Sequence, residues 1–227
     1  MDTHFTIADG HRFSEICKLL EAEYGVPDPS NPPLGNVLNP LDELVYIMLT
    51  TMTEYGAQDA FNRIKENFKN WEDVLTVPKE KFFYFLKPLG LVNQRGNRLI
   101  EIFSSLKENF GAVTLDPLKN MSTKEAEEFL TSLPGVGIKI ARCVLLYSLN
   151  REVFPVDTHV LRLCRRLGLI SPSISWQKSH DILQNAITPK DRYSLHVNLV
   201  LHGKKVCKAK RPKCEECILT RNCAKLT

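Results

Sequence analysis

The chain has 227 residues, of which 43% are hydrophobic and 25% are charged, and its formal net charge is +4. This composition is ordinary for a soluble globular protein, and the length is ample for a core in one large domain or two smaller ones. No apolar run approaches the roughly 18 residues that a membrane span needs, and Met1–Gly10 lacks the basic-then-apolar order of a signal peptide.

Helical periodicity dominates the first half of the chain. Apolar residues at helical spacing predict a helix over residues 13–22, and a segment rich in Pro, Asn and Ser follows it at 27–33. Asn39 and Pro40 supply an N-cap and a first-turn proline for the next helix, whose core residues begin at Leu41. Further helices are predicted at residues 57–68, 71–76, 79–86 and 93–110.

The second half continues the helical pattern. Ser122 and Glu125 form a capping box before an apolar helix, which ends at the sequence Leu-Pro-Gly-Val-Gly at 133–137. Four more helices are predicted at residues 138–149, 158–167, 176–187 and 193–202. The fold class is therefore all-α, with a second, metal-bearing subdomain. Because chain ends often lie close together, we expect the N-terminal helix to pack with that subdomain.

Four of the seven cysteines follow the spacing C-x6-C-x2-C-x5-C, at Cys207, Cys214, Cys217 and Cys223. Without an export signal, a reducing compartment is expected, where four such cysteines are metal ligands. All-cysteine ligation points to zinc or an iron–sulfur cluster, and the wide gaps around one C-x2-C pair favour the bulkier cluster. Zinc and, more remotely, disulfides remain alternatives. The other three cysteines are expected to be small buried hydrophobes: Cys17, Cys143 and Cys164.

Basic residues concentrate around this motif. Residues 204–227 hold eight Lys or Arg side chains against two Glu, a net charge of +6. Such a loop either offsets the charge of the thiolates or faces a polyanion. The segment Arg162–Arg166 adds a second basic point.

The hairpin at 133–137 carries two glycines, Gly135 and Gly137, that allow positive φ and expose backbone N–H groups. At the start of a helix these N–H groups can bind a phosphate without reading sequence. A tight turn between two helices, with glycine present for steric reasons, is the simpler interpretation.

Two side chains beyond the hairpin are candidates for chemistry. Lys139 lies in the first turn of the following helix, where the positive helix end should lower its pKa and favour a neutral amine. Asp157 precedes the next helix and could serve as its N-cap, or as a carboxylate that stabilises a cationic transition state. Taken alone, each residue also fits an ordinary role, a surface lysine and a helix cap.

Taken together, these motifs resemble the helix-hairpin-helix DNA glycosylases of the endonuclease III family. The resemblance runs from about Asn39 to Cys223. It rests on Leu133-Pro-Gly-Val-Gly-Ile-Lys-Ile-Ala141, on Val156-Asp-Thr-His-Val-Leu-Arg-Leu-Cys164, on Leu201-His-Gly-Lys204 and on the four-cysteine spacing. It implies a six-helix barrel domain and a helical cluster domain with a DNA cleft between them. The expected domains are residues 39–150, with the hairpin at about 123–149, residues 151–227, and an N-terminal helix and linker at 1–38 that packs with the latter.

The resemblance also implies roles for individual residues. Lys139 matches the family's nucleophile and Asp157 its catalytic aspartate, while the four C-terminal cysteines match the ligands of a [4Fe–4S] cluster. The implied reaction is attack on C1′ of a flipped-out nucleotide, loss of a damaged base and a Schiff base that permits β-elimination. Related adenine glycosylases lack the lysine, so Lys139 favours a bifunctional glycosylase and abasic-site lyase. The implied DNA contacts are Gly135, Val136, Gly137, His159, Lys208, Lys210 and Arg211.

The expected partner is double-stranded DNA that holds a damaged base or an abasic site, and the expected state is a monomer without membrane contact. The setting expected for such an enzyme is the nucleoid of a prokaryotic cytoplasm. The cluster is expected to be structural, holding the basic loop against the DNA backbone. An oxidised pyrimidine is the substrate implied by the family.

One loop departs from the family pattern. Met52 and Tyr55 stand where the family typically has glutamine and aspartate. We expect Met52 to be a wedge that tolerates different sequences and Tyr55 to border the base pocket, because apolar side chains can insert between bases. Met52 as an ordinary core residue of its helix is the alternative.

Asn198 also departs, since it stands where related chains often carry tryptophan. Some stretches, including Phe154-Pro-Val-Asp-Thr, are similar to the plant 5-methylcytosine glycosylases. Another modified or mismatched pyrimidine, such as 5-methylcytosine or a T or U mismatch, is therefore an alternative substrate. A non-catalytic DNA-binding or redox-sensing iron–sulfur module is an alternative of a different class, and a zinc-stapled transcription factor has no recognition helix to support it.

Overall fold

The computed structural model describes residues 7–51 and 56–225, and it confirms the all-α fold class. Within these ranges the only β pairing is one antiparallel bridge between Ile7 and Ile170. None of the described helices is both long enough and apolar enough to cross a membrane. The chain divides into two compact units: unit 1 combines Met1–Gly35 with Asn150–Thr227, and unit 2 is Asn36–Leu149.

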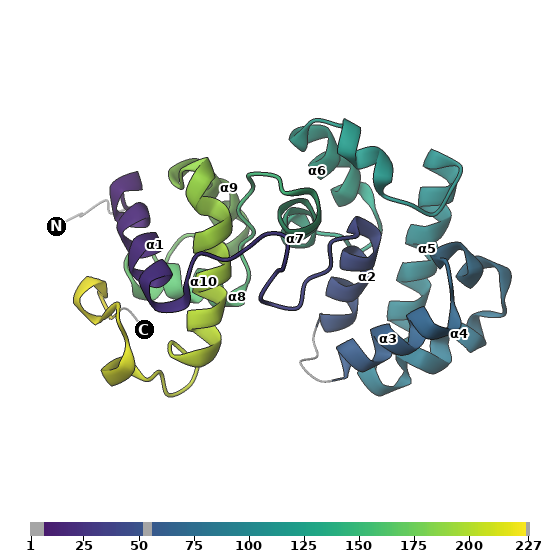
Figure 1. The fold of residues 1–227 in the computed structure, drawn as a ribbon, viewed down its shortest axis with the longest axis horizontal. Helices are drawn as coiled ribbons and strands as arrows, with labels where there is room; N and C mark the ends of the chain where they lie inside the picture. The colour runs from purple at the N-terminus through teal and green to yellow at the C-terminus, as the bar shows by residue number, and fades with distance from the viewer. Residues whose placement is uncertain (1–6, 52–55, 226–227) are drawn as a thin grey trace. The chain divides into compact units, whose positions relative to one another are not determined.

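Unit 1 is built from two distant stretches of sequence (Figure 1). Its α-helices are α1 (Gly10–Tyr24), α8 (Thr158–Arg166), α9 (Trp176–Ala186) and α10 (Arg192–Lys205). Short 3-10 turns lie at Pro189–Asp191, Cys214–Glu216 and Thr220–Asn222. Helix α10 packs against both α1 and α8, so the N-terminal helix belongs to the same unit as the C-terminal cysteines.

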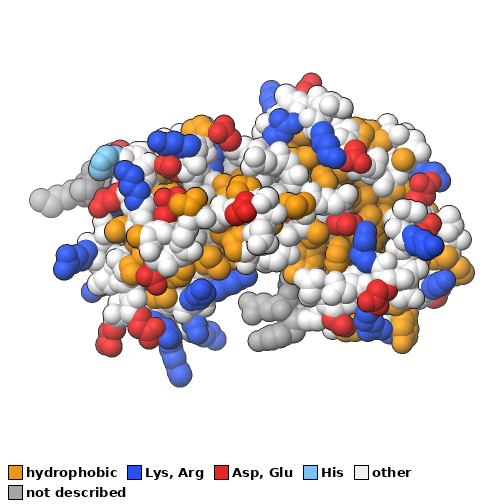
Figure 2. Space-filling view, viewed as in Figure 1, with side chains coloured by type: hydrophobic (Ala, Val, Ile, Leu, Met, Phe, Trp, Pro, Cys, Tyr) orange, Lys and Arg blue, Asp and Glu red, His pale blue; other side chains and the backbone are white. Residues whose placement is uncertain are grey.

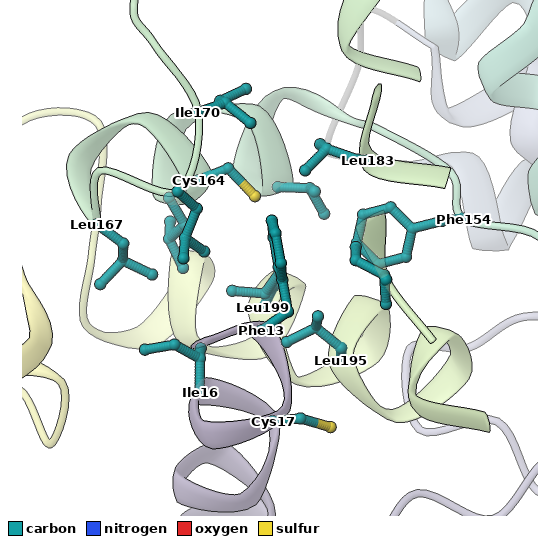
Figure 3. Packing of buried hydrophobic residues seen from close by; sticks show 14 of the residues in the cluster. Phe13, Ile16, Cys17, Phe154, Cys164, Leu167, Ile170, Leu183, Leu195 and Leu199 are labelled. Atoms are coloured by element: carbon teal, nitrogen blue, oxygen red, sulfur yellow. The ribbon is translucent and has the colours of Figure 1, made fainter. Parts of the chain in front are cut away.

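The core of unit 1 forms where these helices meet (Figure 3). Phe13 and Ile16 of α1 are almost fully buried, and Leu199 of α10 packs in the same cluster. Asn198, also on α10, is buried as well and donates from Nδ2 to the carbonyl oxygen of Gly25, 3.0 Å away. This amide joins the middle of α10 to the end of α1.

Arg12 makes a second connection within unit 1. Its guanidinium donates to the carbonyl oxygens of Leu167 at 2.7 Å, Gly168 at 3.3 Å and Asn222 at 3.1 Å. One side chain on α1 therefore binds both the end of α8 and the C-terminal loop. Carbonyl groups away from water need hydrogen-bond donors, and those beyond a helix end receive none from the helix itself. The guanidinium of Arg12 supplies the donors here.

Unit 2 contains six α-helices among its described residues. They are α2 (Pro40–Thr50), α3 (Ala57–Asn67), α4 (Lys79–Leu86), α5 (Val92–Phe110), α6 (Thr123–Ser132) and α7 (Ile138–Leu149). Further 3-10 turns lie at Trp71–Thr76, Lys87–Leu89 and Asp116–Asn120. Helix α7 packs against α2 and α6, which places the hairpin on one side of the α2 core helix.

The predicted helix starts of unit 2 are confirmed. Asn39 Oδ1 accepts hydrogen bonds from the N–H groups of Leu41 and Asp42, both at 3.0 Å, and Pro40 occupies the first turn of α2. Ser122 and Glu125 form the reciprocal capping box of α6. These caps are local in sequence, which is why the sequence alone predicts them.

The helix predicted at residues 71–76 is present with these bounds, as the 3-10 helix Trp71–Thr76. Pro78 explains why it ends there, because the residue before a proline is driven out of the α region. Val77 is accordingly extended, at φ −112° and ψ 160°. The run is thus too short for a stable α-helix.

The three cysteines outside the C-terminal motif are buried, as predicted. Burial raises the pKa of both Cys17 and Cys164 to about 12. Thiols held this firmly in the protonated form are poor nucleophiles. They are packing residues of the core.

Gly96 of α5 allows a close approach to α4. A methyl group added at Gly96 would lie 2.1 Å from a ring carbon of Phe83. We expect Gly96→Ala to lower the free energy of unfolding by about 1–3 kcal/mol, because overpacking shifts the ring or the helix. Urea denaturation measures this change.

Gly137→Ala is the matched control for Gly96→Ala. A methyl group at Gly137 would meet no atom within 4 Å, and the φ of this residue is ordinary. Its stability should change by no more than about 0.5 kcal/mol. Equal urea midpoints for the two variants would contradict the packing argument.

Candidate functional site

The hairpin between α6 and α7 has the expected tight turn. The N–H of Val136 donates to the carbonyl oxygen of Leu133 at 3.1 Å, and Gly135 has φ +74°, a value that favours glycine. Leu133 and Val136 are buried, while both glycines are exposed. The two apolar side chains therefore anchor a turn whose backbone faces outward.

Gly137 differs from the prediction, because its φ is not positive. A Cβ there would meet nothing within 4 Å, so neither strain nor crowding inside the protein requires glycine. The missing side chain leaves open space at the start of α7. Glycine in such a place allows another molecule to approach the backbone closely.

Lys139 is the second residue of α7 and is half-buried. It lies directly after the hairpin, in the first turn of α7, where the N–H groups point along the helix axis and lack helical acceptors. Its charge acts on a buried carboxylate of α2, Glu43, and lowers the pKa of that group. The side chain thus belongs to the protein's own electrostatic network.

Glu43 is a functional candidate that the sequence analysis missed. It has no exposed surface, and its carboxylate accepts from the N–H of Val37 at 2.6 Å and from Asn36 Nδ2 at 2.5 Å. Burial raises the pKa of Glu43 to about 7, although those two hydrogen bonds and the charge of Lys139 lower it. The signal in the sequence is an acidic residue inside the apolar run that starts at Leu41.

Asp157 is the N-cap of α8, as one of its two predicted roles requires. Its Oδ1 accepts from the N–H of Val160 at 2.7 Å, and the side chain is half-buried. The preceding segment from Val153 to Val156 is fully buried and holds the carboxylate in place. Its charge also raises the pKa of His159, against a larger lowering by burial.

His159 and Arg162 of α8 contact Gly203 of α10. Arg162 donates to the carbonyl oxygens of Gly203 at 3.0 Å and Cys207 at 2.9 Å, and its NH2 lies 3.1 Å from His159 Nδ1. A methyl group at Gly203 would come within 2.9 Å of His159. Glycine in the Leu-His-Gly-Lys motif therefore allows α8 and α10 to touch.

The arginines of α8 bind the protein itself. Arg166 donates to the carbonyl oxygens of Lys208 at 2.7 Å and Ala209 at 3.1 Å, and Arg165 donates to that of Ile174 at 2.6 Å. Like Arg162, both side chains donate to backbone carbonyl groups of unit 1. The second basic point that the sequence indicates at residues 162–166 thus also anchors the backbone of unit 1.

The basic loop after α10 is exposed, and Lys and Arg side chains gather at the lower edge of unit 1 (Figure 2). Lys208, Lys210 and Arg211 all have exposed side chains, and Arg211 has a left-handed backbone, φ +53°. Because Arg166 fixes the carbonyls of this loop, its cations project from an anchored backbone.

The four C-terminal cysteines line a single cavity of about 280 Å³. Its other walls include Leu163, Leu167 and Leu219. Burial raises the pKa of Cys217, and the nearby charges of Cys207 and Cys223 raise it further. The four cysteines thus border one space whose walls are largely apolar.

That cavity is large for a single ion. Among the described residues, no three His, Cys, Asp or Glu side chains lie close enough together to hold one metal ion. The cavity exceeds by roughly tenfold or more the space that one water molecule needs. Four thiolate donors around such a volume fit a bulky group better than a zinc ion with its short bonds.

A second cavity lies in unit 2, beside the hairpin, with a volume of about 60 Å³. Gly135, Thr51 and Leu91 contribute to its wall. Leu91 is 52% exposed and has φ +49°, a strained value for leucine. Sequence reasoning missed it, because a single leucine before a helix has no periodic signal.

Arg95 fixes the end of α2 in the same wall. Its guanidinium donates to the carbonyl oxygens of Met48 at 2.8 Å, Leu49 at 3.3 Å and Thr51 at 2.5 Å. These bonds anchor the backbone that leads into residues 52–55. Met52 and Tyr55 themselves lie outside the described residues.

Comparison with known proteins identifies the class. The family model of the HhH-GPD superfamily base excision DNA repair proteins matches residues 47–189. The chain belongs to this family and has the endonuclease III type of fold.

Two curated relatives and one solved structure define the likeness. A putative DNA glycosylase of Arabidopsis thaliana is 32% identical over 165 residues, which is 72% of this chain and 56% of that protein. Endonuclease III of Thermotoga maritima is 28% identical over 82% of this chain and 83% of its own length. A non-covalent endonuclease III–DNA complex superposes with a TM-score of 0.82 at 20% identity, covering 96% of this chain and 97% of that one.

The burial of Glu43 leads to a prediction on stability. The pKa of Glu43 rises from 4.5 to about 7 on folding, so the folded state binds the proton more tightly than the unfolded state. The stability that Glu43 contributes is therefore fully present below about pH 4.5 and is lost as the pH rises through 7. Glu43→Gln cannot ionise. Relative to the wild type, this variant should therefore gain stability between pH 5 and 8, by an amount on the order of 2–3 kcal/mol. Denaturant unfolding at several pH values measures the gain.

Glu125→Gln is the control for this pH series. Hydrogen bonds from Ser122 lower the pKa of the exposed Glu125, so the stability that its carboxylate contributes is already fully present above pH 5. Its difference from the wild type should stay flat from pH 5 to 8. A flat curve for Glu43→Gln as well would show that Glu43 titrates as in an unfolded chain.

Proposed function

We propose that this protein is a bifunctional DNA glycosylase and abasic-site lyase that removes damaged pyrimidines, oxidised ones above all. The observation that carries the proposal is Lys139, a half-buried amine in the first turn of α7, directly after an outward-facing glycine hairpin. The hairpin supplies a grip on the DNA backbone and the lysine supplies a nucleophile. The relatives named endonuclease III support the same reaction.

The proposed reaction begins when the uncharged Nζ of Lys139 attacks C1′ of an everted nucleotide. The bond from C1′ to the base breaks, and the base leaves with its electron pair and takes up a proton. Opening of the sugar ring gives an imine between Nζ and C1′. Removal of a C2′ proton then expels the 3′ phosphate, and hydrolysis frees the lysine.

Asp157 is proposed as the carboxylate that assists this attack. Its Oδ1 is already engaged with the start of α8, so the carboxylate has a fixed orientation. Negative charge near C1′ stabilises the positive charge that develops there as the base leaves. A helix cap and an electrostatic role are compatible in one side chain.

DNA binding is proposed to use the hairpin and the basic loop. The open space at Gly137 admits a phosphate to the backbone at the start of α7, where the helix dipole favours anions. Lys208, Lys210 and Arg211 add exposed cations in unit 1. Each phosphate that they neutralise should steepen the salt dependence of binding by about one unit of slope.

Leu91 is proposed as an apolar wedge. Its exposure and strained φ place an apolar tip outward from the wall that it shares with Gly135. Apolar side chains at such positions can separate stacked bases. Met52 and Tyr55 keep their proposed roles, Met52 as a wedge and Tyr55 at the border of the base pocket.

A [4Fe–4S] cluster is proposed at Cys207, Cys214, Cys217 and Cys223. The donor set and the cavity that the four residues line both support this group. When bound, it supplies four iron–thiolate bonds that fix the C-terminal loop. The chain's own contribution is to hold the basic loop at Lys208 and Ala209 through Arg166.

Borohydride trapping tests the proposed function. Wild-type protein should form a covalent complex with duplex DNA that holds an abasic site, and Lys139→Ala should abolish the complex, since no imine can form. Asp157→Asn should slow base removal by about 10²-fold or more. A nicking screen with oxidised, 5-methylated and mismatched pyrimidines identifies the substrate.

Lys124→Ala is the control for trapping, because Lys124 is 86% exposed on α6. It should trap as well as the wild type. A persistent complex with Lys139→Ala would reassign the nucleophile. Duplex binding without cleavage of any lesion would instead favour a non-catalytic DNA-binding module.

Leu91→Ala tests the wedge. The variant should weaken excision from duplex DNA about tenfold, through loss of roughly 1–2 kcal/mol of apolar contact. Its melting temperature should not fall, because the side chain is exposed. Val26→Ala, at a 75% exposed valine of unit 1, is the control. Unchanged excision from duplex DNA by Leu91→Ala would rule out the wedge.

A further inference from the structure

A buried histidine forms part of the wall around the four cysteines. His202 of α10 is 1% exposed and lines the cavity. Its Nε2 lies 3.3 Å from Cys217 Sγ, and its Nδ1 lies 2.9 Å from the hydroxyl oxygen of Tyr24. Both ring nitrogens are therefore engaged, one with a proposed metal ligand and the other with the last residue of α1.

The chemistry of a metal-bound thiolate determines which ring nitrogen of His202 carries the proton. Such a thiolate carries lone pairs and no hydrogen, so the proton of the 3.3 Å contact has to be on His202 Nε2. A neutral imidazole has only one N–H, which leaves Nδ1 as an acceptor. Tyr24 then donates its hydroxyl proton to His202, and His202 donates to Cys217.

Packing holds this chain of donors in position. The Tyr24 and His202 rings meet edge to face, with centroids 5.9 Å apart, and Lys205 Nζ lies 5.2 Å from the centroid of the Tyr24 ring. The carbonyl oxygen of His202 also accepts from the N–H groups of Val206 and Cys207, both at 2.9 Å. The imidazole can therefore neither turn nor withdraw without disturbing the loop.

The other cysteines have different surroundings. Arg166 NH1 lies 3.5 Å from Cys207 Sγ, the N–H of Lys225 lies 3.3 Å from Cys223 Sγ, and Cys214 is exposed. His202 differs from these donors, because it is a buried ring with a second partner that sets its tautomer.

We propose that His202 is a positioning residue for the cluster, and that its Nε2–H···Sγ bond to Cys217, oriented by Tyr24, raises the reduction potential of the bound cluster. The inference rests on the cluster in the proposed function. Reduction adds negative charge that spreads onto the sulfur ligands, so an N–H donor stabilises the reduced form.

The test measures the midpoint potential of the loaded protein by voltammetry at an electrode, which supplies the electron. His202→Leu removes the N–H and should shift the potential to more negative values. His202→Gln keeps an N–H donor of similar reach and should restore most of the wild-type value. Tyr24→Phe removes only the hydroxyl that sets the tautomer and should give a smaller shift in the same direction.

His196→Leu is the control, since this buried histidine lies on the same helix and has Nδ1 3.0 Å from the carbonyl oxygen of Pro155. It should leave the potential unchanged. A loaded His202→Leu protein with the wild-type potential overturns the inference, as does an equal shift in the Leu and Gln variants. If the His202→Leu protein does not bind the cluster, the other two variants provide the test. A wild-type potential for Tyr24→Phe, together with a potential for His202→Gln that shows no recovery, would overturn the inference.

Anaerobically prepared wild-type protein should show the broad visible absorption of a cluster, with iron and sulfide. Their absence would overturn the cluster and this inference together, whereas borohydride trapping through Lys139 would still test the glycosylase proposal. A cluster present with unshifted potentials would overturn the inference alone.

Discussion

The carbonyl groups at helix ends impose the constraint on which this fold depends. An α-helix leaves its last carbonyls without partners, and a protein made of short helices has many such ends. Here guanidinium groups supply the missing donors. Arg95 binds the end of α2 and Arg12 the end of α8. Arg192 binds the carbonyls of Gln184 at 2.6 Å and Ile187 at 3.1 Å, at the end of α9.

The same device explains how the basic loop is held. Arg162 and Arg166, one helical turn apart on α8, bind the carbonyls that follow α10. Their planar, multidonor groups suit several acceptors at once, which a lysine could not match. The arginines of α8 therefore anchor the loop, whereas Lys208, Lys210 and Arg211 on the loop itself remain exposed.

Local features were predictable from the sequence, because caps and turns depend on a few neighbouring residues. Asn39, Ser122 and Asp157 all cap helices as expected, and the cysteine spacing brings four thiols around one cavity. A neighbour or a tertiary contact decided what the sequence left open. Pro78 ends the 3-10 helix at residues 71–76, and backbone carbonyls accept hydrogen bonds from the arginines of α8.

The remaining features depend on contacts between residues far apart in the sequence. The buried carboxylate of Glu43 accepts hydrogen bonds from Asn36 and Val37, and Leu91 is notable for its exposure and its backbone angle. The link from Tyr24 to His202 joins positions 178 residues apart. No spacing or periodicity encodes such a pairing, so only the folded chain reveals these residues.

The interrupted construction of unit 1 has a consequence for synthesis on the ribosome. Helix α1 is made early, but the α10 surface that covers Ile16 is translated about 170 residues later. At about 5–20 residues per second, the apolar side of α1 waits roughly ten to thirty seconds for its cover. Unit 2 is complete well before then and can fold in the interval. The nascent chain thus carries an uncovered amphipathic helix ahead of a finished domain, a natural point of contact for chaperones.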